Sequence, residues 1–379
     1  MTKKYTPFNK PYLTGKETTY IEEAVASGKI SGNGMFTQKC QTFFEDTFQI
    51  KKALLTTSCT DALEMCAILL NITEGDEVIM PSYTFVSTAN AFVLRGAKIV
   101  FADSKPDYPN IDETKLEALI TNKTKAIVVV HYGGVACEMD TIMRLAKQNN
   151  IFVVEDAAQA IDSYYKGKAL GSIGHLATFS FHETKNIISG EGGLLAINES
   201  QFVDRAEIIW EKGTNRSAFF RGEVDKYGWV DLGSSFLPSE VIAAFLWAQL
   251  ENIEKIQSRR KNIWNKYYQG LLPLEVDGKI KLPKLPNDTT NNGHLFFVLC
   301  NSFKERSELI SFLKAKNIHA VFHYLSLHKS VFYKSKHDNR DLINSDIFTD
   351  RLLRLPLFFE LDDETIKEIV IEIKAFYES

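Results

Sequence analysis

A lysine follows an apolar, β-rich run, in a stretch of the chain that is rich in small and hydroxyl residues. Lys185 comes after residues 178–181 and precedes Ser189-Gly190-Glu191-Gly192-Gly193. Most lysines are solvated surface residues, but this setting is typical of a crevice. A lysine with a lowered pKa is a nucleophile that forms a Schiff base with a carbonyl compound. The segment therefore predicts carbonyl chemistry at Lys185.

An acidic residue ends another apolar run. Residues 151–154 lead into Glu155-Asp156-Ala157-Ala158-Gln159. Ligands of open α/β sheets bind at the carboxyl ends of the strands, so Asp156 could face a crevice there. It could pair with a buried cation, hold a metal or simply cap the next helix. Together with Lys185, it suits pyridoxal phosphate (PLP), an aldehyde cofactor whose pyridine nitrogen needs an acidic partner.

PLP also needs donors for its phosphate and a flat apolar cover for its ring. Residues 54–63 combine a short apolar run, a hydroxyl-rich turn with Ser58 and Thr60, and a helical pattern. A helix N-terminus favours phosphate, although both hydroxyls could equally be ordinary N-caps. Residues 81–88 follow another apolar run and contain Tyr83 and Phe85, either of which could cover the ring. An aromatic residue at such a place is also common in a hydrophobic core.

The elements that must position these residues alternate between strand and helix. Seven short apolar runs occupy residues 53–55, 77–80, 98–101, 126–130, 151–154, 178–181 and 194–197. Helical patterns lie between them at residues 60–70, 87–95, 112–120 and 139–149. Continuously apolar strands separated by helices predict a mostly parallel sheet that is covered on both faces.

The pattern changes after residue 240. Residues 240–254 predict one long helix that leads to a smaller α+β domain. That domain has an apolar run at residues 295–299 and helices at 304–316 and 362–377. We therefore expect a large domain over residues 1–250 and a small domain over residues 251–379.

Composition narrows the function classes. The 44 basic and 48 acidic residues give a net charge of −4, which does not favour nucleic acid or an anionic membrane as a partner. Five scattered cysteines without a CxxC pair do not indicate a disulfide framework or a zinc site. No apolar signal core or membrane span is present, so we expect a cytoplasmic protein.

Taken together, these segments are similar to the DegT/DnrJ/EryC1/StrS sugar aminotransferases. The resemblance runs through nearly the whole chain, from residues 28–32 through 155–159 and 179–186 to Arg354-Leu355-Pro356-Leu357-Phe358. It implies the fold type I architecture of aspartate aminotransferase. It also implies PLP as the cofactor and a role in supplying an amino sugar for cell-surface polysaccharide.

The resemblance assigns a role to several positions. Lys185 matches the Schiff-base lysine that also moves protons, Asp156 the partner of the pyridine nitrogen, and Gln159 the residue bonded to the ring hydroxyl. The phosphate cradle corresponds to Thr60, Asp61 and Ser180, the stacking ring to Phe85, and the residues facing the substrate to His182 and Glu183.

One segment departs from many relatives, which carry a Gly-x-Asn-Tyr-Arg run whose asparagine reaches the partner subunit's PLP phosphate. Here Ser235 stands at the asparagine position and Leu237 at the arginine position. A serine donates to phosphate over a shorter reach. By analogy with the family, we expect a homodimer with the site at the subunit interface.

A nucleotide sugar would also need basic and aromatic contacts. Arg216 lies in a polar stretch, residues 211–226, that could equally be a solvated loop. His323, Tyr324 and His328 lie in a segment that resembles the substrate mouth of the family, although a single histidine is often structural.

The expected reaction is amino transfer from L-glutamate to the 4-keto carbon of dTDP-4-dehydro-6-deoxy-D-glucose, giving dTDP-4-amino-4,6-dideoxy-D-galactose. This reaction is implied by a closer resemblance to the family members that make this 4-amino sugar. The segments that carry it are residues 78–97, 135–143, 181–186 and 211–217. The glucose epimer and a 3-amino sugar remain alternatives. A PLP-dependent dehydratase is less favoured, because such relatives carry a histidine in place of the lysine. The intact set of Asp156, Gln159 and Lys185 also argues against a non-enzymatic PLP-binding regulator.

Overall fold

The computed structural model describes residues 5–378, and its centre is a seven-stranded sheet. The strand order is β1-β9-β8-β5-β4-β2-β3. β9 is antiparallel to both of its neighbours, β1 and β8, whereas the other neighbouring pairs are parallel. The strands are β1 (Lys52–Thr56), β2 (Glu77–Pro81), β3 (Lys98–Ala102), β4 (Thr124–Val130), β5 (Phe152–Asp156), β8 (Leu176–Ser180) and β9 (Gly193–Ile197). The mostly parallel sheet and all seven of its predicted strands are confirmed, with ends that differ by at most two residues.

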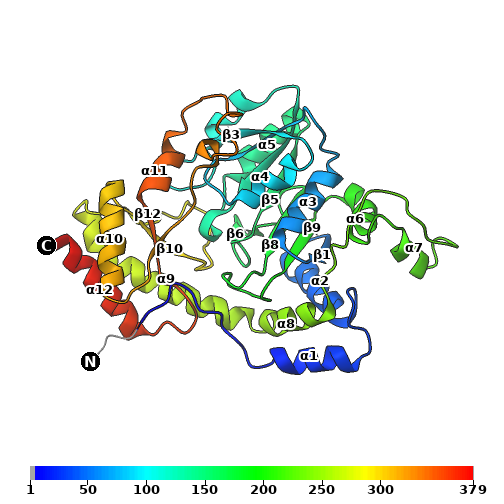
Figure 1. Cartoon of the computed structure of the whole chain (residues 1–379), viewed down its shortest axis with the longest axis horizontal. Helices are drawn as coiled ribbons and strands as arrows, with labels where there is room; N and C mark the ends of the chain where they lie inside the picture. The colour runs from blue at the N-terminus through cyan, green and yellow to red at the C-terminus, as the bar shows by residue number, and fades with distance from the viewer. Residues whose placement is uncertain (1–4, 379) are drawn as a thin grey trace.

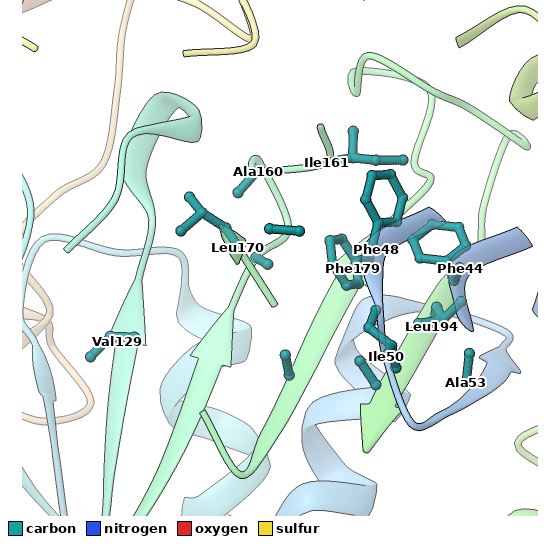
Figure 2. Packing of buried hydrophobic residues seen from close by; sticks show 14 of the residues in the cluster. Phe44, Phe48, Ile50, Ala53, Val129, Ala160, Ile161, Leu170, Phe179 and Leu194 are labelled. Atoms are coloured by element: carbon teal, nitrogen blue, oxygen red, sulfur yellow. The ribbon is translucent and has the colours of Figure 1, made fainter. Parts of the chain in front are cut away.

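Helices cover both faces of the sheet. Successive side chains of a strand point to opposite sides, so a continuously apolar strand presents apolar side chains on both faces. On one face, Ala53 and Leu55 of β1 share a core with α2 (Met35–Phe48), α5 (Met139–Asn149) and α8 (Glu240–Leu250). On the other face, Leu54 shares a core with α3 (Cys59–Leu69), α4 (Val86–Val93) and α6 (Val203–Trp210). Figure 2 shows Phe44 of α2 against Phe179 of β8, with ring centroids 5.2 Å apart.

Two helix predictions are wrong. Residues 112–120 form two single 3-10 turns, Glu113–Lys115 and Glu117–Leu119. The Asp112 side chain caps the first of these turns by accepting from Thr114 N–H at 3.1 Å, and Leu116 is the cap residue that separates the two turns. The predicted helix 240–254 is divided, because α8 ends at Leu250 and α9 begins at Ile253. Asn252 lies between them and its side-chain amide donates to the carbonyl of Ala248, which α8 leaves open.

The long helix α9 (Ile253–Val276) runs from the large sheet to the smaller C-terminal part (Figure 1). That part contains an antiparallel sheet in the order β10-β12-β11, built from β10 (Phe296–Leu299), β11 (Val321–Phe322) and β12 (Leu352–Leu355). The helices α10 (Phe303–Ala315), α11 (Ile343–Arg351) and α12 (Asp363–Glu378) complete it. The predicted fold type I architecture, with a large sheet and a smaller α+β part, matches this arrangement.

Outside these layers, β6 (Tyr164–Tyr165) and β7 (Lys168–Ala169) form a separate antiparallel pair. α1 (Glu17–Ala26) packs against α8, and α7 (Arg216–Phe220) projects at the end of the molecule opposite the C-terminal part (Figure 1). Within residues 5–378, no helix combines the length and the apolar character that crossing a membrane would require.

Candidate active site

A cavity of about 780 Å³ lies between the large sheet and the small one. Its walls come from the ends of β5 and β8, the first turns of α3 and α4, and the strands β11 and β12. Parallel strands present their carboxyl ends at one edge of a sheet, where ligands of such folds bind. The volume lies within the range of small-molecule sites.

Lys185 lines this cavity from a tight loop after β8. Its backbone N–H donates to the carbonyl of His182 at 2.9 Å, and Ser189 N–H donates to the carbonyl of Phe181 at 2.7 Å. Burial lowers the pKa of the Lys185 amine, while Cys59 and Asp156 oppose that change. Among residues 5–378, no hydrogen bond or ion pair occupies this amine. An amine that is partly desolvated and without a partner is suited to attack a carbonyl.

Asp156 ends β5 and its carboxylate is buried at the cavity wall. It accepts hydrogen bonds from the Thr88 hydroxyl at 2.7 Å and from Ala158 N–H at 3.2 Å. Burial raises the pKa of Asp156, although both of these hydrogen bonds act to lower it. No ion pair with a described residue compensates its charge, so a cationic ring nitrogen in the cavity would be a favourable partner.

The neighbouring Glu155 points to the other side of the sheet, because side chains alternate along a strand. Its carboxylate accepts from Gly171, Ile173 and Gly174 N–H at 2.8, 2.8 and 2.5 Å, and lies 2.9 Å from His131 Nε2. Glu155 therefore holds the loop that leads into β8, while Asp156 serves the cavity.

Gln159 is held with its amide donor towards the cavity. Its Oε1 accepts from Gly133 N–H at 2.7 Å, which fixes the orientation of the amide. Its Nε2 donates to the Tyr324 hydroxyl at 2.9 Å. A hydrogen-bond donor at this place suits an anionic oxygen on the ring of a bound cofactor.

The first turn of α3, where the sequence predicts an anion site, faces the cavity. Ser58 caps the helix by accepting from Asp61 N–H at 3.0 Å, and the Thr60 hydroxyl donates to Ser87 at 2.9 Å. Ser58, Cys59, Thr60 and Ser180 all line the cavity. Asp61 does not line it; its carboxylate accepts from the Thr57 hydroxyl, and its N–H donates to the Ser58 cap.

The aromatic wall of the cavity comes from two distant segments. Phe85 precedes α4 and remains 56% exposed, although its ring lines the cavity. Tyr324 lies with its ring centroid 6.2 Å away and stacks on His323 at 3.6 Å. His323 Nδ1 lies 2.5 Å from the Tyr132 hydroxyl, and burial lowers the pKa of this histidine well below its usual value. His323 is therefore a neutral side chain at neutral pH.

The other residues predicted for the site are spread over the molecule. His182 lines the cavity, whereas Glu183 is exposed beside it and accepts a hydrogen bond from Asn9 at its carbonyl. His328 lies outside the cavity, buried with its Nδ1 2.7 Å from the Ser82 hydroxyl. Arg216 and Ser235 are exposed and do not line the cavity; Arg216 begins α7, and Ser235 pairs with Glu211, which follows α6.

The structure also brings in residues that sequence reasoning missed. Thr88 supports Asp156 from α4, and Arg354 and Arg260 reach the cavity from the C-terminal part. Arg354 lies in the Arg354-Leu355-Pro356 run that carries part of the family resemblance, so a signal existed for it. No local pattern marked Thr88, because only the packing of α4 on β5 makes it a partner of Asp156.

The donor set of the cavity fits PLP. An unpartnered amine, a buried carboxylate without a cation, an oriented amide donor and a helix N-terminus with hydroxyls face one space. The half-exposed Phe85 ring offers an apolar surface in the same space. Each of these groups corresponds to one chemical part of the cofactor, namely its aldehyde, ring nitrogen, ring oxygen, phosphate and ring face.

Comparison with known proteins agrees with this reading. The model of the DegT/DnrJ/EryC1/StrS aminotransferase family matches residues 11–374, and the chain belongs to this family. GDP-perosamine synthase of Escherichia coli O157:H7 is 33% identical over 99% of both chains.

Solved structures show the same relationship. The aminotransferase TlmJ of Streptoalloteichus hindustanus has a TM-score of 0.91 at 26% identity, covering 99% of both chains. Spr1654 of Streptococcus pneumoniae, in its PMP form, has a TM-score of 0.89 at 26% identity, covering 99% of both chains. The chain is accordingly a PLP-dependent sugar aminotransferase with the fold of these structures.

Proposed function

We propose that the chain transfers the amino group of L-glutamate to the 4-keto carbon of a nucleotide-linked 4-keto-6-deoxyhexose. The observation that carries the proposal is one cavity that contains the free amine of Lys185, the buried carboxylate of Asp156 and the amide donor of Gln159. Lysine, aspartate and glutamine in this arrangement suit amino transfer, and the family to which the chain belongs performs it.

When bound, PLP supplies an aldehyde carbon and a ring that withdraws electrons. Lys185 Nζ would carry the cofactor and would move the proton between the substrate carbon and the cofactor in both halves of the reaction. Asp156 would hold the ring nitrogen in its cationic form, and Gln159 would donate to the ring oxygen. The first turn of α3, with Thr60 and with Ser180 opposite, would hold the phosphate.

A second hollow of about 610 Å³ supports a large substrate. It shares Phe85, His323 and Tyr324 with the main cavity and continues past Leu325 and Val331 to the surface. A keto sugar near Lys185 would leave its nucleotide in this direction. His182 beside the lysine and His323 on the shared wall would then contact the sugar.

Our preferred substrate is dTDP-4-dehydro-6-deoxy-D-glucose, with dTDP-4-amino-4,6-dideoxy-D-galactose as the product. Four segments of the sequence, residues 78–97, 135–143, 181–186 and 211–217, support this choice through their resemblance. The 33% identity to a GDP-perosamine synthase favours a guanosine nucleotide as the second candidate. We place the reaction in the cytoplasm, where the five free cysteines of the chain would stay reduced.

We further propose that two copies of the chain form the functional unit. The projecting region over residues 212–235 exposes large apolar side chains, including Phe220 at 69% and Trp229 at 83%. Exposed apolar clusters of this kind mark interaction surfaces. Ser235 and Arg216 lie in this region, so both would be placed to reach the partner subunit's cavity.

The decisive experiment offers purified protein the dTDP-linked and the GDP-linked keto sugar with L-glutamate, and follows the product by mass spectrometry and proton NMR. A 4-amino product with an axial amine supports the galactose assignment, and an equatorial amine supports its epimer. The Lys185→Ala variant is the matched control. A wild-type protein that binds PLP and aminates neither sugar would contradict the proposed substrate class.

A further inference from the structure

His294 lies on the wall of the cavity, and the contacts proposed for the cofactor leave its side chain unused. It stands two residues before β10, with 9% of its surface exposed. Its N–H donates to Asn292 Oδ1 at 3.0 Å, and its carbonyl accepts from the Arg260 guanidinium at 2.7 Å. The backbone that carries the imidazole is therefore fixed from two sides.

Two backbone carbonyls set the polarity of the side-chain amides behind this ring. Gln257 Nε2 donates to the carbonyl of Ile161 at 3.1 Å, so Gln257 Oε1 is left as an acceptor. Asn186 Nδ2 donates to that Oε1 at 2.8 Å and to the carbonyl of Asn292 at 2.9 Å. Because a carbonyl oxygen only accepts hydrogen bonds, neither amide can be turned around. Asn186 Oδ1 is thereby left as an acceptor.

The Asn186 amide in turn fixes the tautomer of His294. His294 Nδ1 lies 2.8 Å from Asn186 Oδ1 and must carry the hydrogen, because that oxygen only accepts. Burial lowers the pKa of His294 well below its usual value, and the charge of Lys185 acts in the same direction. The ring is therefore neutral at neutral pH. A neutral imidazole has a single N–H, so Nε2 carries a lone pair.

This lone pair is free to accept a hydrogen bond from a ligand. No residue that the structure describes donates to His294 Nε2, and Nδ1 is already used on the protein side of the ring. His294 and Lys185 line the same cavity, and the lysine charge acts on the imidazole. An acceptor in a largely buried place is costly to leave unpaired. The site therefore favours a ligand that brings an O–H or N–H group close to Lys185.

The two proposed substrates differ in what they offer to such a lone pair. L-glutamate has no hydroxyl, its carboxylates only accept, and its amine is the group that is transferred. The keto oxygen and the ring oxygen of the sugar also only accept. Of the two carbons beside the keto carbon of a 4-keto-6-deoxyhexose, C3 carries a hydroxyl and C5 does not. The 3-hydroxyl is therefore the hydrogen-bond donor closest to the carbon that is aminated.

We propose that His294 Nε2 accepts a hydrogen bond from the 3-hydroxyl of the keto sugar and selects sugars that carry this hydroxyl. This inference rests on the proposed amination of a 4-keto-6-deoxyhexose. The amino-acid donor would leave the lone pair unused. His294 would therefore determine specificity in the second half of the reaction only.

The test compares the two half-reactions in His294→Asn. An asparagine here keeps an N–H group that can reach Asn186 and removes the Nε2 lone pair. The second half uses enzyme reconstituted with pyridoxamine phosphate and offers the 4-keto sugar or its 3-deoxy counterpart. We expect kcat/KM to fall at least about 10-fold for the 3-hydroxy sugar and less than about threefold for the 3-deoxy sugar. The first half, followed by the absorbance of the PLP holoenzyme with L-glutamate, should change less than about threefold, which would also show that the variant folds.

Equilibrium binding gives a readout that is independent of turnover. The ligand is nucleotide-linked 6-deoxyglucose, in its dTDP and GDP forms, which has a hydroxyl in place of the keto group and cannot accept the amine. In calorimetry, the wild-type protein should bind it at least about 10-fold more tightly than its 3-deoxy form, whereas His294→Asn should bind both within about threefold. A wild type that does not distinguish the two sugars, or a variant that still prefers the 3-hydroxy sugar, would overturn the inference. Equal losses in both half-reactions would do the same.

The matched control is His175→Asn. His175 comes before β8, at the end of that strand away from Ser180, and its Nδ1 accepts from Val153 N–H at 2.8 Å. It does not line the cavity, so this variant should keep both half-reactions and the preference for the 3-hydroxyl. If the wild type aminates no 4-keto sugar, the proposed function is wrong, and the calorimetric comparison still decides the role of His294.

Discussion

The hydroxyl of Thr88 should control how strongly the site holds its cofactor. Thr88 lies on α4 with 1% of its surface exposed, and its Oγ1 donates to Asp156 Oδ2 at 2.7 Å. The only other hydrogen bond to that carboxylate from a described residue comes from Ala158 N–H at 3.2 Å. Thr88→Val keeps the shape of the side chain and removes the shorter of the two hydrogen bonds.

The size of the effect follows from the burial of the acceptor. A hydrogen bond to a charged group contributes about 1.5–3 kcal/mol. At about 1.4 kcal/mol per factor of ten, its loss from Asp156 should weaken PLP binding by about 10- to 150-fold. The pKa of Asp156 is already raised by burial and should rise further in the variant. Less of the carboxylate would then be ionised to pair with the ring nitrogen.

The assay is a PLP titration of the apoprotein, followed by absorbance. Thr88→Ser is the matched control, because it keeps the hydroxyl and should hold PLP within about threefold of wild type. Thr88→Val that binds PLP as tightly as Thr88→Ser would refute the reasoning, because the hydrogen bond would then not support the charge on Asp156.

The pH dependence of stability provides a second readout of the same variant. A carboxyl whose pKa is raised on folding costs stability once it ionises, so this cost appears as the pH rises through the folded-state pKa. Thr88→Val makes the ionised form less favourable still. The difference in stability between the variant and wild-type apoproteins should therefore be larger at pH 7 and shrink as the pH falls below the raised pKa.

Further predictions concern the cofactor site, the fold and the subunit contact. Lys185→Ala should lower turnover at least about 1,000-fold. The apoprotein of Lys185→Met should have a melting temperature no lower than that of wild type at pH 7, because burial lowers the pKa of Lys185 and makes its charged form unfavourable inside the protein. For the same reason, capture of PLP by the wild-type apoprotein should increase with pH around a midpoint below the ordinary lysine value of about 10.4. Glu240→Gln should reduce the free energy of unfolding in urea by about 1.5–3 kcal/mol. The reason is that the Glu240 carboxylate accepts from Gly34, Phe36 and Thr37 N–H at 2.9, 2.7 and 3.1 Å. An unchanged urea midpoint would contradict a stabilising role for these hydrogen bonds. Trp229→Ala should weaken the proposed dimer at least about 30-fold in sedimentation experiments, and a wild-type chain that is monomeric and fully active would refute the dimer itself.

Much of the large sheet and the centre of the site could be predicted because their signals are local. Each of the seven strands is a short apolar run, and such runs keep their identity when helices cover both faces. Asp156 ends β5 and Lys185 lies in the loop after β8, and these two strands are neighbours in a parallel pair. Two chemistry-bearing residues at the carboxyl ends of adjacent strands must face the same edge, so their proximity followed once the strands were recognised.

Local patterns failed where the long-range packing chooses between alternatives. Residues 112–120 have helical composition, yet they form two 3-10 turns instead of an α-helix. Glu155 and Asp156 are chemically equivalent in the sequence, and only the orientation of β5 assigns one to a loop and the other to the cavity.

The sequence alone determined the chemistry of this protein, because lysine, aspartate and a hydroxyl-rich helix start each lie in a short recognisable segment. The tertiary structure decided which distant residues serve that chemistry. Thr88 is 68 positions from Asp156, and Arg354 reaches the cavity only because β12 lies between β10 and β11. Such contacts depend on how distant elements pack against one another. This packing depends on the whole chain, so the spacing of residues within a short segment does not predict it.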